Sequence, residues 1–282
     1  MLKALYVIAC AAVTLSLAGG ANAQPRLFKG EPAYQNNETR TLVNEMITAH
    51  GGTEPWQDIS TLKFEIITKV IGNGSAPTYS IETTNLNSGA AYLDYPFWDA
   101  EIVWNNSEVW SRNWPLPLPP GFFTRLSTSF ITLPWLTQNK HVKLSGLMPG
   151  HLPGDETLYD VVKMEFKNPG PSIPGEYYEL FIDRETHLLA GIGFNITHPF
   201  MMQISSQPVG PNYHKFTEYK NVGGLVIPTY YETHGYNSQN GGITRAMHAV
   251  FGLDLNETFD ESRLPRQDDS VIDESTTQWW DR

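Results

Sequence analysis

The chain has 282 residues, of which 40% are hydrophobic and 17% are charged, and its formal net charge at pH 7 is −11. A surface this acidic repels nucleic acid and anionic lipid headgroups, so we expect no nucleic-acid partner. The length suits one large β domain or two small ones, and no Pro/Ser-rich linker divides the chain.

The first 23 residues have the pattern of a secretory signal. Lys3 is followed by an apolar run from about Leu5 to Ala18 and then by Ala21-Asn22-Ala23, an A-x-A cleavage site. The apolar run is too short for a comfortable membrane span. We therefore predict a signal peptide at 1–23, export across the inner membrane, and a soluble mature chain in the periplasm.

The single cysteine, Cys10, lies inside this signal. The mature chain then has no thiol to form a disulfide, to ligate a metal or to act as a nucleophile. An exported chain without disulfides must be held together by its core, which fits a bacterial periplasmic protein. We expect neither a metal nor a cofactor.

The segment NNETRTLVNEMITAHGG, residues 36–52, predicts the first helix. Asn36 and Asn37 are good N-cap residues, and Leu42, Val43, Met46, Ile47 and His50 repeat at the spacing of one helical face. Gly51 or Gly52 supplies the left-handed C-terminal position. His50 therefore stands in the last turn, where an imidazole can bond to free carbonyls, and we interpret it as structural rather than catalytic.

After this helix the hydrophobic period changes to two, which indicates strands. The strand-like runs are LKFEIITKVI, PTYSIETTNL, AEIVWNNSEVWSR, DVVKMEF, EYYELFIDRETHLLAGIGFNI and HKFTEYKNVGGLVIPTYYETHGY. Asn105-Asn106, residues 183–186 and residues 222–224 are the predicted hairpin turns. Because most connections are hairpins, we expect an antiparallel, meandering sheet. Pro228 within a strand indicates an edge or a bulge.

An aromatic, proline-rich insertion, residues 112–138, interrupts the hairpins. Five of the eight tryptophans lie between Trp98 and Trp135, and Phe122, Phe123, Leu126 and Phe130 fall at helical spacing. The insertion either forms a lid over an apolar cavity or completes an ordinary core. In the first case the candidate ligand-binding residues are Trp98, Trp104, Trp110, Trp114, Phe122, Phe123, Phe130 and Trp135.

The final stretch, residues 263–282, is acidic, polar and poorly patterned. We predict that it is a flexible tail, which leaves residues 24–262 as a single β domain. Trp279-Trp280 near its end are either a docking point or a loose aromatic pair.

The order of these elements resembles that of the LolA-type periplasmic lipoprotein carrier superfamily. The motifs that carry the resemblance are AHGGTEPW, LKFEI, VWNNSEVW, LPWL, YELFIDRETHLL and GGLVIPTYYETHG, over roughly residues 38–250. The resemblance is closer to secreted relatives with a comparable AHGG…W start. It implies a mainly β (α+β) fold: a strongly curved, incomplete antiparallel β-barrel with an N-terminal helix and a lid over a cavity that holds acyl chains. The carriers tie that lid with an arginine, for which Arg112 and Arg125 are the candidates.

Two other functions stay open. The chain has no G-x-S-x-G elbow and no H-E-x-x-H helix. His214 with Glu218, and Glu232 with His234, are spaced so that each pair shares one face of a regular strand, and they are the catalytic candidates of a secreted enzyme. The third hypothesis is a cell-envelope interaction module in which the sheet serves only as a scaffold.

We favour the binding protein over the enzyme. Burial of an acyl chain contributes roughly 0.8 kcal/mol per methylene, so such a site needs shape and dryness more than a catalytic motif. The expected ligand is a lipid, a fatty-acyl chain or a lipoprotein. We expect a monomer that contacts an envelope protein transiently.

Overall fold

The computed structural model describes residues 30–72, 74–124, 126–166, 177–196, 209–235 and 243–275. Several sequence predictions therefore fall outside the described residues. They are the signal peptide with Cys10, the lid candidate Arg125, and Trp279-Trp280.

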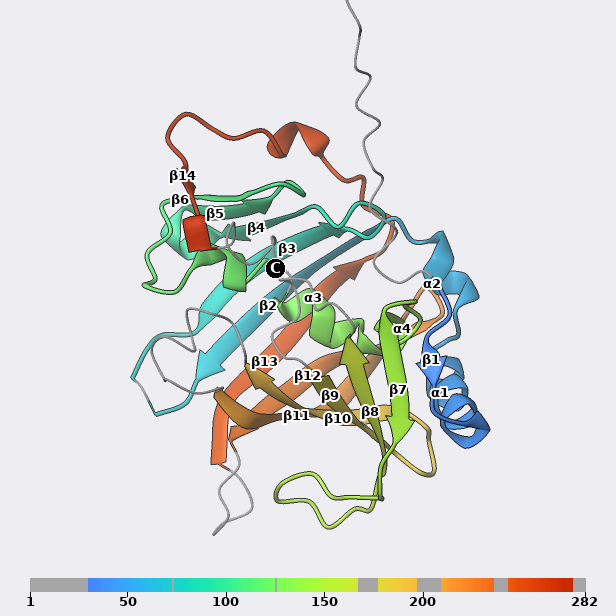
Figure 1. Cartoon of the computed structure of the whole chain (residues 1–282). Coiled ribbons are helices and arrows are strands. Elements are labelled where there is room, and N and C mark those ends of the chain that lie inside the picture. Colours follow the sequence, from blue (N-terminus) through green and yellow to red (C-terminus); the bar gives the residue numbers. More distant parts are fainter. Residues whose placement is uncertain are drawn as a thin grey trace, which may run out of the picture.

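One sheet of fourteen strands contains all the strands of the described residues. In spatial order they are β1 (Ala33–Tyr34), β7 (Val142–Gly146), β8 (Asp160–Phe166), β9 (Tyr177–Ile182), β10 (Leu189–Ile196), β11 (Val209–Val222), β12 (Leu225–Gly235), β13 (Ile243–Asp254), β2 (Thr61–Val70), β3 (Thr78–Asn85), β4 (Ala91–Tyr95), β5 (Ala100–Trp104), β6 (Val109–Arg112) and β14 (Val271–Ile272). Among these strands only β1 and β7 pair in parallel. The sheet curves strongly but does not close, which confirms the predicted incomplete barrel (Figure 1).

The helices of the described residues are few and short. They are α1 (Asn37–Ala49), α2 (Glu54–Asp58), α3 (Leu126–Ile131) and α4 (Leu133–Leu136). Three single-turn 3-10 helices are η1 (Pro96–Trp98), η2 (Pro120–Phe122) and η3 (Glu261–Arg263). Over the described part of the chain, no helix has both the length and the apolar character needed to cross a membrane.

Helix α1 begins and ends where the sequence predicts. The Asn36 side chain caps it by accepting a hydrogen bond from the backbone N–H of Thr39 at 2.8 Å. Gly51 follows the helix with φ +102°, and a Cβ there would lie 2.1 Å from the carbonyl oxygen of Gly224. Only glycine therefore fits where the chain leaves α1 and passes the β11–β12 turn.

His50 joins that helix end to the sheet. Its side chain is fully buried, Nδ1 donates to the Val226 carbonyl at 2.6 Å, and Nε2 accepts from the Leu189 N–H at 3.0 Å. Burial lowers the pKa of His50 to about 4, so the imidazole is neutral. The predicted structural role is confirmed, although the carbonyl that His50 binds belongs to β12 rather than to the helix.

The predicted hairpin turns are also present. Asn106 has φ +74° between β5 and β6, and the Asn105 side chain accepts from the N–H groups of Ser107 and Glu108. Gly223 and Gly224 close the β11–β12 turn with positive φ. Pro228 pairs with Tyr219 beside a register shift in β11, so it marks a bulge within the sheet rather than an edge strand.

The insertion runs from β6, near one end of the strand order, to β7, near the other. It crosses the inner side of the curved sheet, and α3 and α4 lie against that side (Figure 1). Its last part is core: the Trp135 ring stacks on Trp56 with 4.7 Å between centroids, and its Nε1 donates to the Gly52 carbonyl. Both indole rings are buried in the main hydrophobic core.

Residues 263–275, which the sequence assigns to a tail, lie along the outer strands of the sheet. The Arg263 guanidinium donates to the carboxylates of Asp94 and Glu101 and lies 4.0 Å from the centroid of the Tyr92 ring. Strand β14 pairs with β6, and the Asp273 carboxylate accepts from the Gly121 N–H in the insertion at 2.8 Å. This segment therefore braces the start of the insertion.

Candidate functional site

A partly open cavity of about 100 Å³ lies between the insertion and the inner side of the sheet. Strands β2, β3, β12 and β13 form its floor, and α3 with the chain before it forms its cover. The lining residues are Ile66, Thr68, Thr78, Ser80, Glu82, Tyr95, Trp98, Trp114, Leu116, Phe123, Leu126, Ser127, Phe130, Tyr231 and His248.

Four of the eight predicted ligand-binding residues line this cavity: Trp98, Trp114, Phe123 and Phe130. Trp114 is the centre of an aromatic wall, with its ring 5.9 Å from Trp98, 5.0 Å from Tyr95 and 5.1 Å from Phe123. Its Nε1 donates to the Leu118 carbonyl, so the indole N–H is satisfied within the insertion. The wall thus presents ring faces and edges to the cavity.

The other four predicted residues do not line it. Trp135 is part of the main core, and Phe122 packs edge-on against Phe123. Trp104 belongs to the buried cluster against which the aromatic wall packs. Trp110 pairs with Val103, the neighbour of Trp104 in β5, so it faces the opposite side of the sheet, where its Nε1 donates to the Leu264 carbonyl.

A carboxyl group that no sequence pattern indicated, that of Glu82, lines the cavity. Glu82 on β3 is 3% exposed; its Oε1 accepts from the hydroxyls of Ser80 at 3.1 Å and Ser127 at 3.0 Å. Its Oε2 is buried and has no hydrogen-bond partner among the described residues. Burial raises the pKa of Glu82 to about 7, against the opposing effect of the two serine hydrogen bonds.

A chain of hydrogen bonds between side chains runs behind the cavity. His248 contacts the Thr68 hydroxyl through Nδ1 at 3.0 Å and the Thr233 hydroxyl through Nε2 at 2.8 Å. The same Thr233 hydroxyl lies 3.0 Å from Nδ1 of His214. Burial lowers the pKa of His248 to about 3 and that of His214 well below its usual range, so both imidazoles are neutral. The Tyr231 ring stacks on His248 at 4.3 Å.

The four catalytic candidates do not converge. His214 is buried on the inner side, whereas Glu218 is exposed because the register of β11 shifts between Phe216 and Glu218. Glu232 and His234 do share a face, with 3.2 Å between Oε2 and Nε2, but neither lines the cavity. This arrangement does not support the catalytic alternative.

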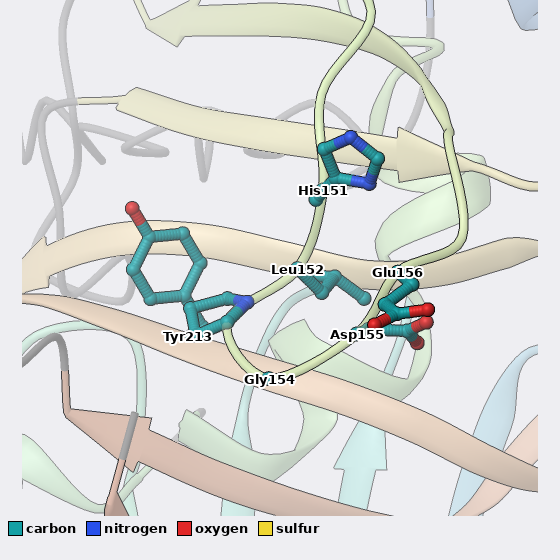
Figure 2. Close-up of a pocket in the computed structure, with 7 residues that line it drawn as sticks. His151, Leu152, Gly154, Asp155, Glu156 and Tyr213 are labelled. Carbon is teal, nitrogen blue, oxygen red and sulfur yellow. The ribbon is translucent and has the colours of Figure 1, made fainter. Parts of the chain in front are cut away.

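A larger depression of about 440 Å³ lies around the β7–β8 loop and is open to solvent. Figure 2 shows Asp155 and Glu156 close together on this loop, with Tyr213 apart from them. The Asp155 carboxylate lies 2.7 Å from Lys215 Nζ and accepts from the Tyr159 hydroxyl at 2.9 Å. Burial opposes ionisation of Asp155, but the hydrogen bonds from Lys215, Thr157 and Tyr159 lower its pKa below the usual range. These paired charges hold the loop on the sheet.

No protein-family model and no curated protein matches the chain. Among solved structures it is similar to a DUF1329 family protein from Desulfovibrio piger, with a TM-score of 0.50, 7% identity, and coverage of 80% of this chain and 97% of the other. A LolA superfamily protein from Nitrosomonas europaea matches with a TM-score of 0.49, 9% identity and coverage of 81% and 97%. A putative outer membrane lipoprotein-sorting protein domain from Vibrio parahaemolyticus matches with a TM-score of 0.46, 10% identity, and coverage of 81% of this chain and 96% of the other.

At these identities the likeness is one of fold. The match to the DUF1329 family protein shows a shared fold over 80% of this chain, and the open, curved sheet is the fold that the LolA-type resemblance implied. The site must be argued from its own residues.

Proposed function

We propose that the protein is a periplasmic carrier that holds an acyl chain of a lipid or lipoprotein between the insertion and the curved sheet. The observation that carries this proposal is the cavity under the aromatic insertion, which Trp114 and Phe123 of the insertion line together with Trp98 of η1. A filled interior would favour a scaffold module, and convergent catalytic side chains would favour an enzyme. The cavity favours the carrier.

The size of the cavity indicates how a ligand enters. An engineered apolar cavity of about 150 Å³ binds benzene in another protein, so about 100 Å³ accepts only a few carbons of a chain. A longer chain needs the insertion to move away from the sheet. Because each buried methylene contributes roughly 0.8 kcal/mol, a chain that displaces the insertion regains free energy as it becomes buried.

The expected location and organisation follow the sequence. The signal peptide at 1–23 directs the chain to the periplasm, and the single ligand-binding domain predicted over residues 24–262 also includes residues 263–275, because β14 pairs with β6. We propose that the protein acts as a monomer and meets an envelope partner only while it transfers its ligand.

The experiment is native mass spectrometry of protein purified from its own periplasm, followed by lipid extraction and a fluorescent fatty-acid displacement assay. We expect a co-purified or exchangeable amphiphile, and weaker displacement for Trp114→Ala. The matched control is Phe97→Ala, because Phe97 is 76% exposed next to Trp98 and does not line the cavity. The absence of any bound or exchangeable amphiphile would refute the carrier function.

A further inference from the structure

The inner face of β3 carries a row of polar side chains, which is unusual for a surface that a helix covers. Ser80, Glu82 and Thr84 alternate with residues of the opposite face, and all three are at most 5% exposed. Ser127 on α3 donates a hydrogen bond to Glu82. The hydroxyl oxygens of Thr128 and Thr84 are 3.1 Å apart. The row therefore meets α3 through polar contacts. One oxygen of the Glu82 carboxyl group has no partner among the described residues.

The two hydrogen bonds of Glu82 leave one of its carboxyl oxygens, Oε2, without a partner among the described residues. Both serine hydroxyls reach Oε1, so that oxygen is satisfied as an acceptor. Oε2 is left as the oxygen that carries the proton in the neutral acid and the lone pairs in the carboxylate. A buried polar atom without a partner is costly, and a ligand that supplies the missing hydrogen bond removes that cost.

The other titratable groups that line the cavity do not compete for this role. Burial raises the pKa values of Tyr95 and Tyr231, and burial lowers that of His248, so all three are neutral near pH 7. His248 already uses both ring nitrogens, on Thr68 and Thr233. Glu82 is therefore the group of this lining whose charge changes near neutral pH.

We propose that Oε2 of Glu82 is the hydrogen-bond partner of a hydroxyl group on a neutral long-chain amphiphile, whose chain lies along Trp114 and Phe123. This inference rests on the proposed function and names the polar group of its ligand. A hydroxyl both donates and accepts, so it satisfies Glu82 whether or not the carboxyl group is ionised. A fatty acid satisfies it only when one of the two carboxyl groups is protonated, because two close carboxylates repel.

The test uses two probes of equal chain length, ω-bromododecanol and ω-bromododecanoic acid, whose bromine quenches tryptophan fluorescence on contact. Each is titrated into the wild-type protein, Glu82→Gln and Glu82→Leu at about pH 8.5, where Glu82 is mostly ionised. Glutamine keeps a donor and an acceptor at this place, whereas leucine keeps only the volume. Far-UV circular dichroism and a thermal melt establish that all three are folded.

We expect the wild-type protein to bind the alcohol roughly tenfold more tightly than the acid, the difference of about one charge-assisted hydrogen bond. Glu82→Leu should lose roughly tenfold in affinity for the alcohol and should gain affinity for the acid, because the repelling carboxylate is gone. Glu82→Gln should keep its affinity for the alcohol. Equal binding of the alcohol to the wild-type protein and a folded Glu82→Leu overturns this inference and leaves the carrier function standing. If neither probe quenches the wild-type protein, both proposals are overturned.

Discussion

At the scale of single residues, Glu82 makes the stability of the fold depend on pH. Its pKa is about 7 in the folded protein and 4.5 in its unperturbed state, so folding favours the protonated acid. The contribution of that acid to stability is complete below pH 4.5 and is lost as the pH rises through 7. The full loss amounts to roughly 3 kcal/mol, since each pKa unit corresponds to about 1.4 kcal/mol.

We therefore expect Glu82→Gln, which has no proton to lose, to gain stability relative to the wild-type protein as the pH rises. The measurement is urea unfolding of both proteins at about pH 5 and pH 8. His50 and His248 act in the other direction, because their lowered pKa values make stability fall as the pH drops below 6.5. They are present in both proteins, so their effect cancels in the difference. A difference that stays constant with pH would contradict the raised pKa of Glu82.

Residues that obey local rules could be predicted, and Glu82 could not. The Asn36 cap, the Asn106 turn and Gly51 each follow from the conformation of a few neighbouring residues. In β3 the alternation of the sequence predicts that the inward face carries Tyr79, Ile81 and Thr83. The side chains that point inward are instead those of Ser80, Glu82 and Thr84. Their burial depends on α3, which lies more than forty residues away, and no local pattern records that contact.

At the scale of elements, one part of the insertion covers the cavity and another part belongs to the core, whereas the sequence presented lid and core as alternatives. Phe130 and Trp135 are buried in the main core, as a permanent part of the fold would be. Phe122 and Phe123 precede α3 and are only half-buried; Phe123 lines the cavity and Phe122 packs against it. The cover is therefore the first part of the insertion, and its last part anchors the cover to the core.

This division predicts different outcomes for matched phenylalanine substitutions. Phe130→Ala should lower the free energy of unfolding by roughly 3–5 kcal/mol, the range for a fully buried phenylalanine. Phe122→Ala/Phe123→Ala should cost less than that single change while it strongly weakens amphiphile binding. Thermal melts beside a fluorescent fatty-acid displacement assay measure both effects. A collapse of the melting temperature in the double variant would show that Phe122 and Phe123 are core.

Some elements could not be predicted because their pairing with a neighbouring strand leaves no signal in a polar segment. Strand β14 and the Arg263 contacts lie in a segment whose acidic, polar composition indicates a tail. The bulge in β11 turns Glu218 outward, although regular strand spacing places it on the face of His214. Both features depend on a partner strand, and the sequence of one strand does not specify its neighbour.

At the scale of the whole molecule, the insertion spans the open sheet from β6 to β7, and its last part packs into the main core. The sequence predicted the antiparallel hairpins because each is local, but not the long-range order, in which β13 pairs with β2 and β1 runs parallel to β7. That order curves the sheet around α3 and α4. A ligand larger than the cavity can therefore enter only if the insertion separates from β3.

A reversible cross-link between α3 and β3 tests this separation. The hydroxyl oxygens of Thr84 and Thr128 are 3.1 Å apart, and both residues are buried. A disulfide requires Cβ atoms about 3.8 Å apart, and the contact between the two hydroxyl groups shows that the side chains at these positions point toward each other. Cys10 is the one cysteine of the chain, so the double variant Thr84→Cys/Thr128→Cys is prepared from residue 24 onward, where these two thiols are the only ones in the sequence. We expect the oxidised double variant to be more stable, by up to about 4 kcal/mol, and to bind a fatty-acid probe far more weakly than the reduced form.

The comparison is made within one protein, because a reductant opens the cross-link and should restore binding. Thr84→Cys alone, treated with the same oxidant, controls for the lost hydroxyl and for oxidation elsewhere. Mass spectrometry of the alkylated chain measures the fraction cross-linked, and the displacement assay measures binding on the same sample. If a fully cross-linked protein bound the probe as tightly as its reduced form, the insertion would not have to leave β3. The ligand would then lie along the open edge of the cavity, beside Trp98 and Trp114, with the insertion as a fixed wall.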